Sequence, residues 1–232
     1  VVALVGYTNA GKSTLFNRMT RAEVLAKDML FATLDPTLRA VRLPHGERIM
    51  LSDTVGFISD LPTMLVSAFR ATLEEVIEAD VVLHVRDISH EDTDAQSEDV
   101  TQILGELGIA PHDPRIIEVW NKADLLDEDR KAALRNTARL RGEQRTYVVS
   151  AVSGEGVDDL LAGIEERLSA HHETLELEVA AEDGEGLGWL YENAQVLARE
   201  NRPEGEVRLQ LRVAPERLDR LMRRFPGAHP LG

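Results

Sequence analysis

The sequence predicts an α/β fold with a mostly parallel sheet, followed by a smaller α+β domain. Three observations support this prediction. Short apolar runs alternate with helical patterns along residues 1–168, as in proteins whose helices cover a parallel sheet. A glycine-rich loop with the spacing of a phosphate-binding loop joins the first apolar run to the first helical pattern. Beyond residue 174 the pattern changes to alternating strands and short helices.

The first domain is expected to span residues 1–168. Strands are predicted at 1–5, 38–43, 48–51, 81–85, 116–120 and 146–149, and helices at 12–19, 62–79, 93–107 and 157–168. The second and third strands flank Pro44-His45-Gly46, a hairpin-like connection, so one edge of the sheet should be antiparallel. Ligands of open α/β sheets bind at the carboxyl ends of the strands, and we expect the site there.

A linker at 169–173 and a second domain at 174–232 are expected to complete the chain. The predicted elements of this domain are strands at 175–179 and 206–213, a helix that follows 184–188 and includes Leu190, Val196 and Leu197, and a last helix at 215–224. About sixty residues in such a β-α-β-α pattern make a small domain that is marginally stable alone.

Composition limits the classes of protein to which the chain can belong. It contains no cysteine, which excludes disulfides and thiol chemistry and fits a reducing cytoplasm. No apolar run approaches the ~20 residues that a membrane span needs, and the chain starts on a core strand where a signal peptide would lie. A start at Val1 without Met suggests that an upstream segment has been removed. We expect a cytoplasmic protein and a monomer.

The net charge of −15 argues against a generic nucleic-acid binder, because phosphate contacts come from Lys and Arg. Basic residues gather near the C-terminus, at Arg208, Arg212, Arg217, Arg220, Arg223 and Arg224. On the predicted last helix, one face carries Arg217, Arg220 and Arg224, and the inward face carries Leu218, Leu221, Met222 and Phe225. The arginine face is either solvated or contacts RNA or an acidic protein.

The strongest motif is the phosphate-binding loop G-x4-G-K-S. It consists of Gly6, Tyr7, Thr8, Asn9, Ala10, Gly11, Lys12 and Ser13, and Thr14 continues it into the helix. Glycines let successive backbone N–H groups point at an anion, and the helix N-terminus adds positive potential. Lys12 should reach the β- and γ-phosphates, and the Ser13 hydroxyl should ligate Mg²⁺. The chain is therefore expected to bind a nucleoside triphosphate.

A second motif, Asn121-Lys122-Ala123-Asp124, predicts which base is bound. The Asp124 carboxylate can accept two parallel hydrogen bonds, and guanine offers a matching pair of donors that adenine lacks. The alkyl stem of Lys122 should cover the base, and Asn121 should tie this loop to the phosphate loop. A third segment, Ser150-Ala151-Val152, follows another strand and should offer a backbone N–H to guanine O6. We therefore expect GTP and GDP as ligands.

Two further segments are expected to respond to the γ-phosphate. The first is Asp53-Thr54-Val55-Gly56, in which Asp53 should hold Mg²⁺ through water and the Gly56 N–H should contact the γ-phosphate. The second is Phe31-Ala32-Thr33-Leu34-Asp35-Pro36-Thr37. Either threonine hydroxyl of this segment could complete the Mg²⁺ shell, and spacing alone does not choose between them.

Together these motifs resemble the HflX family of bacterial ribosome-associated GTPases. The resemblance rests on GYTNAGKST, FATLDPT, DTVGF and NKAD and covers nearly the whole chain. It implies a GTPase fold, Thr33 as the magnesium ligand in preference to Thr37, binding to the large ribosomal subunit, and dissociation of stalled or idle ribosomes. It also implies an additional N-terminal domain.

Hydrolysis is expected to depend on positioning and charge. Ras-type GTPases orient the attacking water with a glutamine directly after D-x-x-G, whereas this chain has Phe57 there. Lys12, Thr33, Gly56 and Mg²⁺ are the expected catalytic groups. Asn9 is a further candidate: it resembles the loop asparagine of potassium-activated GTPases and could help to hold K⁺, or it could hydrogen-bond only within its own turn.

Two alternative functions remain open from sequence. One is a tRNA-modification or ribosome-assembly GTPase, because related families share the N-A-G-K-S loop. The other is a GTP-dependent binding module whose hydrolysis is incidental, as Phe57 would suggest.

Overall fold

The computed structural model describes residues 1–24, 38–54, 73–142 and 146–231. The chain divides into two compact units, one of residues 1–43 and 48–164 and the other of residues 44–47 and 165–232. Each unit has its own sheet.

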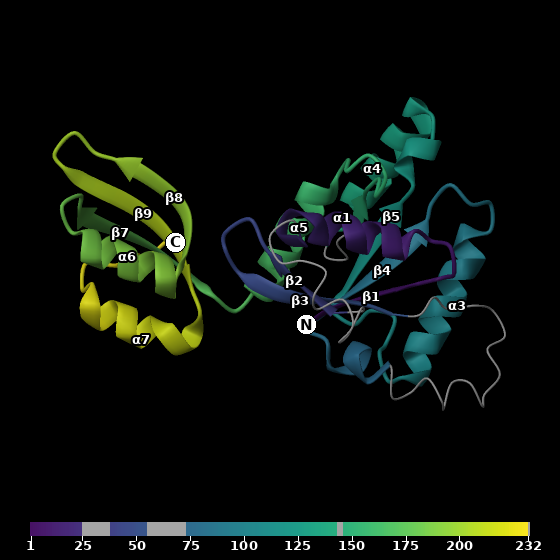
Figure 1. Ribbon diagram of the computed structural model, residues 1–232, viewed down its shortest axis with the longest axis horizontal. Helices are drawn as coiled ribbons and strands as arrows, with labels where there is room; N and C mark the ends of the chain where they lie inside the picture. The colour runs from purple at the N-terminus through teal and green to yellow at the C-terminus, as the bar shows by residue number, and fades with distance from the viewer. Residues whose placement is uncertain (25–37, 55–72, 143–145, 232) are drawn as a thin grey trace. The chain divides into compact units, whose positions relative to one another are not determined.

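In the described part of the first unit, the strands form one sheet in the order β2-β3-β1-β4-β5-β6 (Figure 1). The strands are β1 Val2–Gly6, β2 Leu38–Arg42, β3 Arg48–Asp53, β4 Val81–Asp87, β5 Ile116–Asn121 and β6 Thr146–Val148. Only the pairing of β2 with β3 is antiparallel among these strands. This confirms the predicted mostly parallel sheet with one antiparallel edge.

The helices of this unit are α1 Lys12–Val24, α3 Thr93–Glu106, α4 Glu128–Leu140 and α5 Val157–Leu168, with a short 3-10 turn at Ala123–Leu125. The division between the two units falls within α5, after residue 164. Residues 73–78 are also helical. Side chains of α3 and of residues 73–79 pack on Ala3, Val5 and Val82 from the central strands. Helix α1 lies on the side of the sheet away from α3 (Figure 1). All five residues of β1 are buried, as expected of a central strand covered on both faces.

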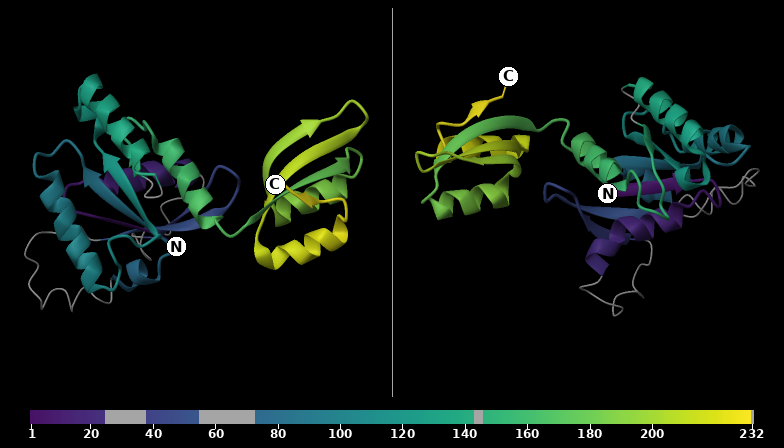
Figure 2. Two further views of the ribbon diagram at one scale, coloured as in Figure 1. Left: turned by 180° about the vertical axis from the view of Figure 1, so that it is seen from behind. Right: turned by 90° about the horizontal axis from the view of Figure 1, so that it is seen from above.

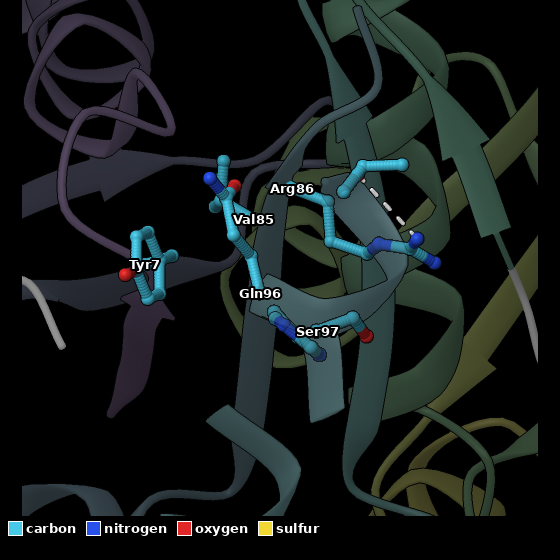
Figure 3. A pocket seen from close by; sticks show the side chains of 7 residues that line it. Tyr7, Val85, Arg86, Gln96 and Ser97 are labelled. Carbon is cyan, nitrogen blue, oxygen red and sulfur yellow. Dashed lines mark hydrogen bonds between the residues drawn. The ribbon is translucent and has the colours of Figure 1, made fainter. Parts of the chain in front are cut away.

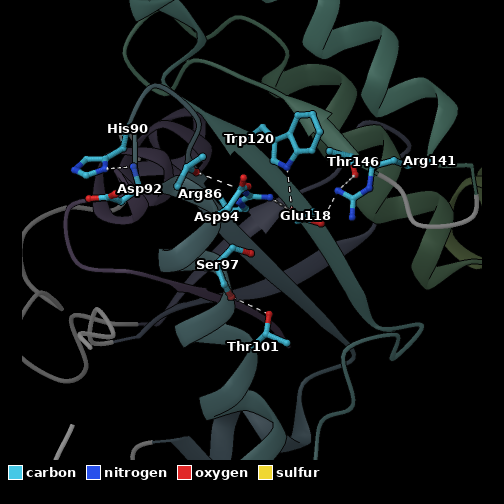
Figure 4. A network of polar contacts seen from close by, with 11 residues as sticks. Arg86, His90, Asp92, Asp94, Ser97, Thr101, Glu118, Trp120, Arg141 and Thr146 are labelled. Atoms are coloured by element: carbon cyan, nitrogen blue, oxygen red, sulfur yellow. Dashed lines mark hydrogen bonds and ion pairs between the residues drawn. The ribbon is translucent and has the colours of Figure 1, made fainter. Parts of the chain in front are cut away.

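A partly buried polar network braces β4 and β5 (Figure 4). Glu118 accepts hydrogen bonds from Arg86 at 2.7 Å and from the Trp120 indole at 3.0 Å, and it pairs with Arg141 at 2.6 Å. The two guanidinium groups lie 5.9 and 5.5 Å from the centre of the Trp120 ring. Burial raises the pKa of Glu118, but these hydrogen bonds and the Arg141 charge outweigh it and lower the pKa to about 2. Trp120 is thus held firmly one residue before Asn121.

His84 lies beside this network, at a small pocket lined by residues of β4 and α3. Figure 3 labels Tyr7, Arg86 and Gln96 among the side chains around this pocket. The residues lining the pocket are Tyr7, His84, Val85, Arg86, Thr93, Gln96 and Ser97. His84 is only 5% exposed, and its Nε2 atom has no hydrogen-bond partner among the described residues. Burial lowers the pKa of His84 to about 4; the charge of Glu118 opposes this, and the charges of Arg86 and Arg141 add to it.

This histidine should make the stability of the protein depend on pH. The unfolded chain binds a proton at His84 below its ordinary pKa of 6.5, whereas the folded protein does so only near 4. The free energy of unfolding should therefore fall as the pH drops through this window, by about 3 kcal/mol in total from this residue. Urea unfolding of the wild type and His84→Leu across the window measures the effect, and the variant should lose this part of the pH dependence.

His90→Leu is the matched control, because His90 is exposed on the loop after β4. Identical pH profiles for the wild type and His84→Leu would contradict this explanation.

The second unit contains a four-stranded antiparallel sheet in the order β10-β7-β9-β8. Its elements are β7 Glu173–Ala180, α6 Gly184–Asn193, β8 Gln195–Asn201, β9 Glu206–Val213, α7 Pro215–Arg224 and β10 His229–Pro230 (Figure 2). Alternate residues of β7 and β9 pack with Leu187, Leu190 and Leu221 from the two helices. This confirms the expected C-terminal α+β architecture.

The turn Pro44–Glu47 belongs to this second unit. Glu165 is 1% exposed, accepts a hydrogen bond from the His45 backbone N at 3.0 Å and contacts His45 Nδ1 at 2.7 Å. Gln195 donates to Glu47 at 2.9 Å. These contacts hold the turn with the residues that follow 165.

Two elements differ most from the sequence predictions: helix α4, which was not predicted, and strand β8. Val196 and Leu197 were assigned to a helix, but helix α6 ends at Asn193 and both residues lie in β8. Ala194 is extended, and β8 pairs with β9 across the turn that contains Pro203 and Gly205. Long-range strand pairing here overrides a local helical spacing. The prediction also placed 184–188 before the helix, whereas Gly184 begins it.

Smaller corrections concern the ends of elements. Helix α1 continues to Val24, beyond the predicted end at Met19. Strand β3 continues to Asp53, and β7 already begins at Glu173, inside the expected linker. Strand β10 was not predicted, because only two residues form it.

The arginine face of α7 turns toward α6. The guanidinium groups of Arg220 and Arg224 lie 5.6 and 5.2 Å from the centre of the Trp189 ring. Arg224 also pairs with Glu185 at 3.0 Å, and Arg217 donates to the Glu192 carbonyl at 3.4 Å. An RNA contact through these arginines stays a prediction, and it would compete with these contacts. The inward face with Leu218, Leu221, Met222 and Phe225 is confirmed by their packing on the core.

Candidate nucleotide-binding site

The phosphate-binding loop connects the end of β1 at Gly6 to the start of α1 at Lys12. Its turn is closed by a hydrogen bond from Ala10 N to the Tyr7 carbonyl at 3.1 Å. Gly11 has a φ of +87°, and a Cβ atom there would lie 2.3 Å from Asn121 Nδ2. Only glycine fits such a position, because both the backbone conformation and the space forbid a side chain.

Lys12 and Ser13 both point to Asp53 at the end of β3. Lys12 is 6% exposed and donates hydrogen bonds to Asp53 Oδ1 and to the Thr54 carbonyl. Ser13 Oγ donates to Asp53 Oδ2 at 3.1 Å. The Thr54 hydroxyl donates to the Leu4 carbonyl at 2.6 Å, which fixes this segment to β1. The structure thus joins the phosphate-binding loop to the Asp53-Thr54 segment.

The same arrangement offers ligands that suit Mg²⁺. A hydroxyl and a carboxylate, from Ser13 and Asp53, lie within hydrogen-bond distance of each other beside a lysine. Mg²⁺ prefers oxygen ligands of this kind and keeps several waters. Ser13 and Asp53 therefore fit the predicted role of holding Mg²⁺, and Lys12 lies directly beside them.

Asn121 is the junction of the three nucleotide motifs. It is 1% exposed at the end of β5. Its Nδ2 atom donates to the Ala10 carbonyl in the phosphate loop at 3.0 Å, and its Oδ1 atom accepts from Ala151 N at 3.0 Å. The tie between the base loop and the phosphate loop, predicted from the sequence, is confirmed.

The base-recognition residues are held by the same loops. Ser150 Oγ donates to Asp124 Oδ1 at 2.8 Å, which orients the carboxylate. Ala123 N donates to the Val149 carbonyl at 3.1 Å. The segment 150–152 is expected to offer one backbone N–H to guanine O6. Of its N–H groups, that of Ala151 donates to Asn121, and Val152 beside it is 68% exposed. The segment 150–152 thus lies next to Asp124, and its contact with guanine O6 stays a prediction.

Two positioning residues were missed by sequence reasoning. Arg18 on α1 donates from Nε to the Ala151 carbonyl at 2.8 Å and from Nη2 to the Val152 carbonyl. Asp87 at the end of β4 pairs with Lys122 at 3.0 Å. Neither residue belongs to a local motif. Arg18 contacts the backbone carbonyl of a residue 133 positions away, and Asp87 contacts a lysine 35 positions away. The pairing of β4 with β5 brings Asp87 to the site, and helix α1 brings Arg18 there.

Several predicted residues lie outside the described part of the chain. These are Phe31, Ala32, Thr33, Leu34, Asp35, Pro36, Thr37, Val55, Gly56 and Phe57. The choice between Thr33 and Thr37, the Gly56 contact and the role of Phe57 remain predictions.

With this geometry established, comparison with known proteins decides the family. Residues 1–122 match the family described as 50S ribosome-binding GTPase, and residues 135–230 match the HflX C-terminal domain. The chain belongs to the HflX family of GTPases. This confirms the resemblance seen in the motifs, and with it the P-loop GTPase fold of the first domain.

Two HflX relatives illustrate an alignment along nearly all of this chain. It is 49% identical over 221 residues to the GTPase HflX of Magnetococcus marinus, an alignment that covers 95% of this chain and 49% of that protein. With the GTPase HflX of Escherichia coli it is 38% identical over 226 residues, covering 97% and 52%. The chain therefore spans about half the length of the HflX relatives it matches.

A solved structure shows a similar fold with a nucleotide bound. The GTP-binding protein of Sulfolobus solfataricus in complex with GDP has a TM-score of 0.56 and 27% identity, over 73% of this chain and 52% of that one. None of the helices within the described residues is long and apolar enough to cross a lipid bilayer.

Proposed function

We propose that this HflX-family chain is the GTP-binding and GTP-hydrolysing part of a switch protein that acts on the large ribosomal subunit. The observation that carries the proposal is the junction at Asn121, which joins the phosphate loop to the base loop and to the segment after β6. Because Asp124 is oriented beside this junction by Ser150, the site supports guanine recognition.

Hydrolysis would follow from charge placed around the terminal phosphates. Lys12 would bind the β- and γ-phosphates, and the helix N-terminus behind it adds positive potential. Ser13, Asp53 and Thr33 would hold Mg²⁺, which supplies charge neutralisation between the phosphates when it is bound. The Gly56 N–H would contact the γ-phosphate, so that loss of this group releases the segment. We expect slow hydrolysis without a partner, because Phe57 cannot orient water.

The ribosomal role rests on family membership. The first family match is described as ribosome-binding, and the second is the domain specific to HflX. We infer that the GTP form binds the large subunit and dissociates stalled or idle ribosomes, as a cytoplasmic monomer. The net charge of −15 implies that such binding uses local basic surface or segments of the longer protein, because the whole chain would be repelled by RNA.

Co-sedimentation of the intact protein tests this function. The protein should pellet with mature large subunits in the presence of a non-hydrolysable GTP analogue and remain in the supernatant with GDP. Parallel samples with small subunits, tRNA and assembly intermediates separate the alternatives. Binding to tRNA or to assembly intermediates, without binding to mature large subunits, would contradict the proposal and favour the alternative GTPase class.

Potassium dependence of hydrolysis tests the role of Asn9. Asn9 has a φ of +67°, is exposed, and its side chain forms no hydrogen bond with another described residue. Its amide oxygen is therefore free to help hold K⁺ near the phosphates, where the ion would replace an arginine finger. We expect faster hydrolysis in K⁺ than in matched Na⁺ buffer, and loss of this preference in Asn9→Ala. Equal wild-type rates in the two salts would end the idea.

A further inference from the structure

Asp87 carries a buried carboxylate beside the base-recognition loop. It is the last residue of β4, is 9% exposed, and lies opposite Asn121 in the register of β4 with β5. The next residue, Ile88, donates its backbone N–H to the Asn121 carbonyl at 3.1 Å. The backbone of this position is thus locked to the strand that delivers the base loop.

Each oxygen of the Asp87 carboxylate has a defined partner. Oδ1 accepts hydrogen bonds from Ser89 N at 3.0 Å and from Ser89 Oγ at 2.5 Å. Oδ2 pairs with Lys122 Nζ at 3.0 Å. Burial raises the pKa of Asp87, but the hydrogen bonds from Ser89 and Lys122 outweigh it and lower the pKa below its usual range. The group is therefore a fixed negative charge with one lysine partner.

Lys122 adopts an unfavourable backbone conformation, and the ammonium group of its side chain has two partners. Its φ of +68° places it in the left-handed region, which non-glycine residues seldom occupy. Its ammonium group donates to the Asn9 carbonyl at 2.8 Å while it pairs with Asp87. Its Cε atom lies 3.6 Å from the point where a Cβ on Gly11 would be. The alkyl stem therefore runs from the end of β5 to the phosphate loop.

We propose that Asp87 is a positioning residue for guanine nucleotides, holding Lys122 so that its stem covers the base and its ammonium group closes onto the phosphate loop. Without Asp87, the ammonium group would keep a single described acceptor, the Asn9 carbonyl, and the strained Lys122 would lose a restraint. The contact lies on the base side of the site. Its loss should therefore weaken GTP and GDP binding equally.

The test measures affinities for fluorescent GDP and GTP derivatives in a double-mutant cycle. Asp87→Ala should weaken binding of both nucleotides by roughly 10-fold, as expected for a lost charge-assisted hydrogen bond. Asp87→Asn, which keeps the acceptor without the charge, should lose less. When Asp87→Ala is added to Lys122→Met, nucleotide affinity should fall by less than about 2-fold, because Asp87 has already lost its lysine partner.

Asp113→Ala is the matched control. Like Asp87, Asp113 pairs with a basic residue, in this case Arg115 at 2.9 Å. Asp113 precedes β5, at the end of that strand opposite to Asn121. This variant should bind nucleotide normally even if its thermal stability falls. If Asp87→Ala does not fold, the isosteric Asp87→Asn carries the test, with a measurable loss expected.

Three results would overturn the inference. The first is an unchanged nucleotide affinity in the Asp87 variants. The second is a double variant whose loss of affinity equals the product of the two single losses, and the third is a variant that loses affinity for GTP but not for GDP. The inference rests on the nucleotide site and not on the ribosomal partner. A wild-type protein that binds neither nucleotide would count against the site itself. A wild type that binds normally, with unaffected Asp87 variants, would count against this inference alone.

Discussion

Asp124→Asn is expected to weaken GTP binding by about 2–4 kcal/mol, because a charge-assisted pair of hydrogen bonds becomes a mismatched amide. The structure supports this expectation, since Ser150 Oγ holds one oxygen of the carboxylate at 2.8 Å beside the Asn121 junction. The same variant should gain affinity for xanthosine triphosphate, whose C2 carbonyl suits an amide donor. Titration of both nucleotides against the wild type and the variant measures the exchange of specificity.

Asp127→Asn provides the control for that experiment. Asp127 lies three residues further along and caps helix α4, accepting a hydrogen bond from Arg130 N at 2.8 Å. Asparagine caps helices as well as aspartate does, so nucleotide binding should be unchanged. If Asp124→Asn keeps its GTP affinity and gains none for the xanthine nucleotide, Asp124 does not read the base.

Asn121→Ala should have an effect of similar size on GTP and GDP alike. The substitution leaves the Ala10 carbonyl and the Ala151 N–H without their buried partner, and both loops lose their tie to β5. Each unsatisfied buried group costs about 1–3 kcal/mol of folding stability, so thermal stability should fall. Nucleotide affinity should fall by about 3 kcal/mol, because the two loops are no longer held in the arrangement that binds the nucleotide. Calorimetric binding and thermal unfolding measure the two effects.

Added GTP or GDP should then raise the thermal stability of Asn121→Ala only slightly, because a ligand stabilises a protein less when it binds more weakly. Asn193→Ala is the control: Asn193 donates to the Trp189 carbonyl at 2.9 Å in the second unit. It should change stability without changing nucleotide affinity. Full GTP affinity in Asn121→Ala would show that the junction does not organise the site.

The parts of the fold that the sequence predicts best are those with local signatures. The phosphate loop needs Gly11 because no Cβ fits beside Asn121, and that requirement is visible as a motif. The parallel strands are visible as apolar runs, since strands covered on both faces contain few polar residues. The order of motifs along such strands then places Lys12, Asp53 and Asn121 at one edge of the sheet, as observed.

Features that depend on long-range pairing could not be predicted in this way. Val196 and Leu197 have helical spacing from Leu190, yet pairing with β9 makes them a strand. Asp87 and Arg18 read as ordinary charged residues, and only the folded structure shows that they hold Lys122 and the carbonyls of Ala151 and Val152. His84 and Glu118 likewise became informative only when burial and their neighbours were known.

Single-turnover hydrolysis of GTP tests the central claim most directly. The intact protein and this chain would be mixed with a trace of GTP, alone and with purified large or small ribosomal subunits, and phosphate release would be followed in K⁺ buffer. The proposed function predicts slow hydrolysis by the protein alone, a marked acceleration by large subunits in the intact protein, and no acceleration by small subunits. An unchanged rate in the presence of large subunits would contradict it and would leave a GTP-dependent binding module as the better description.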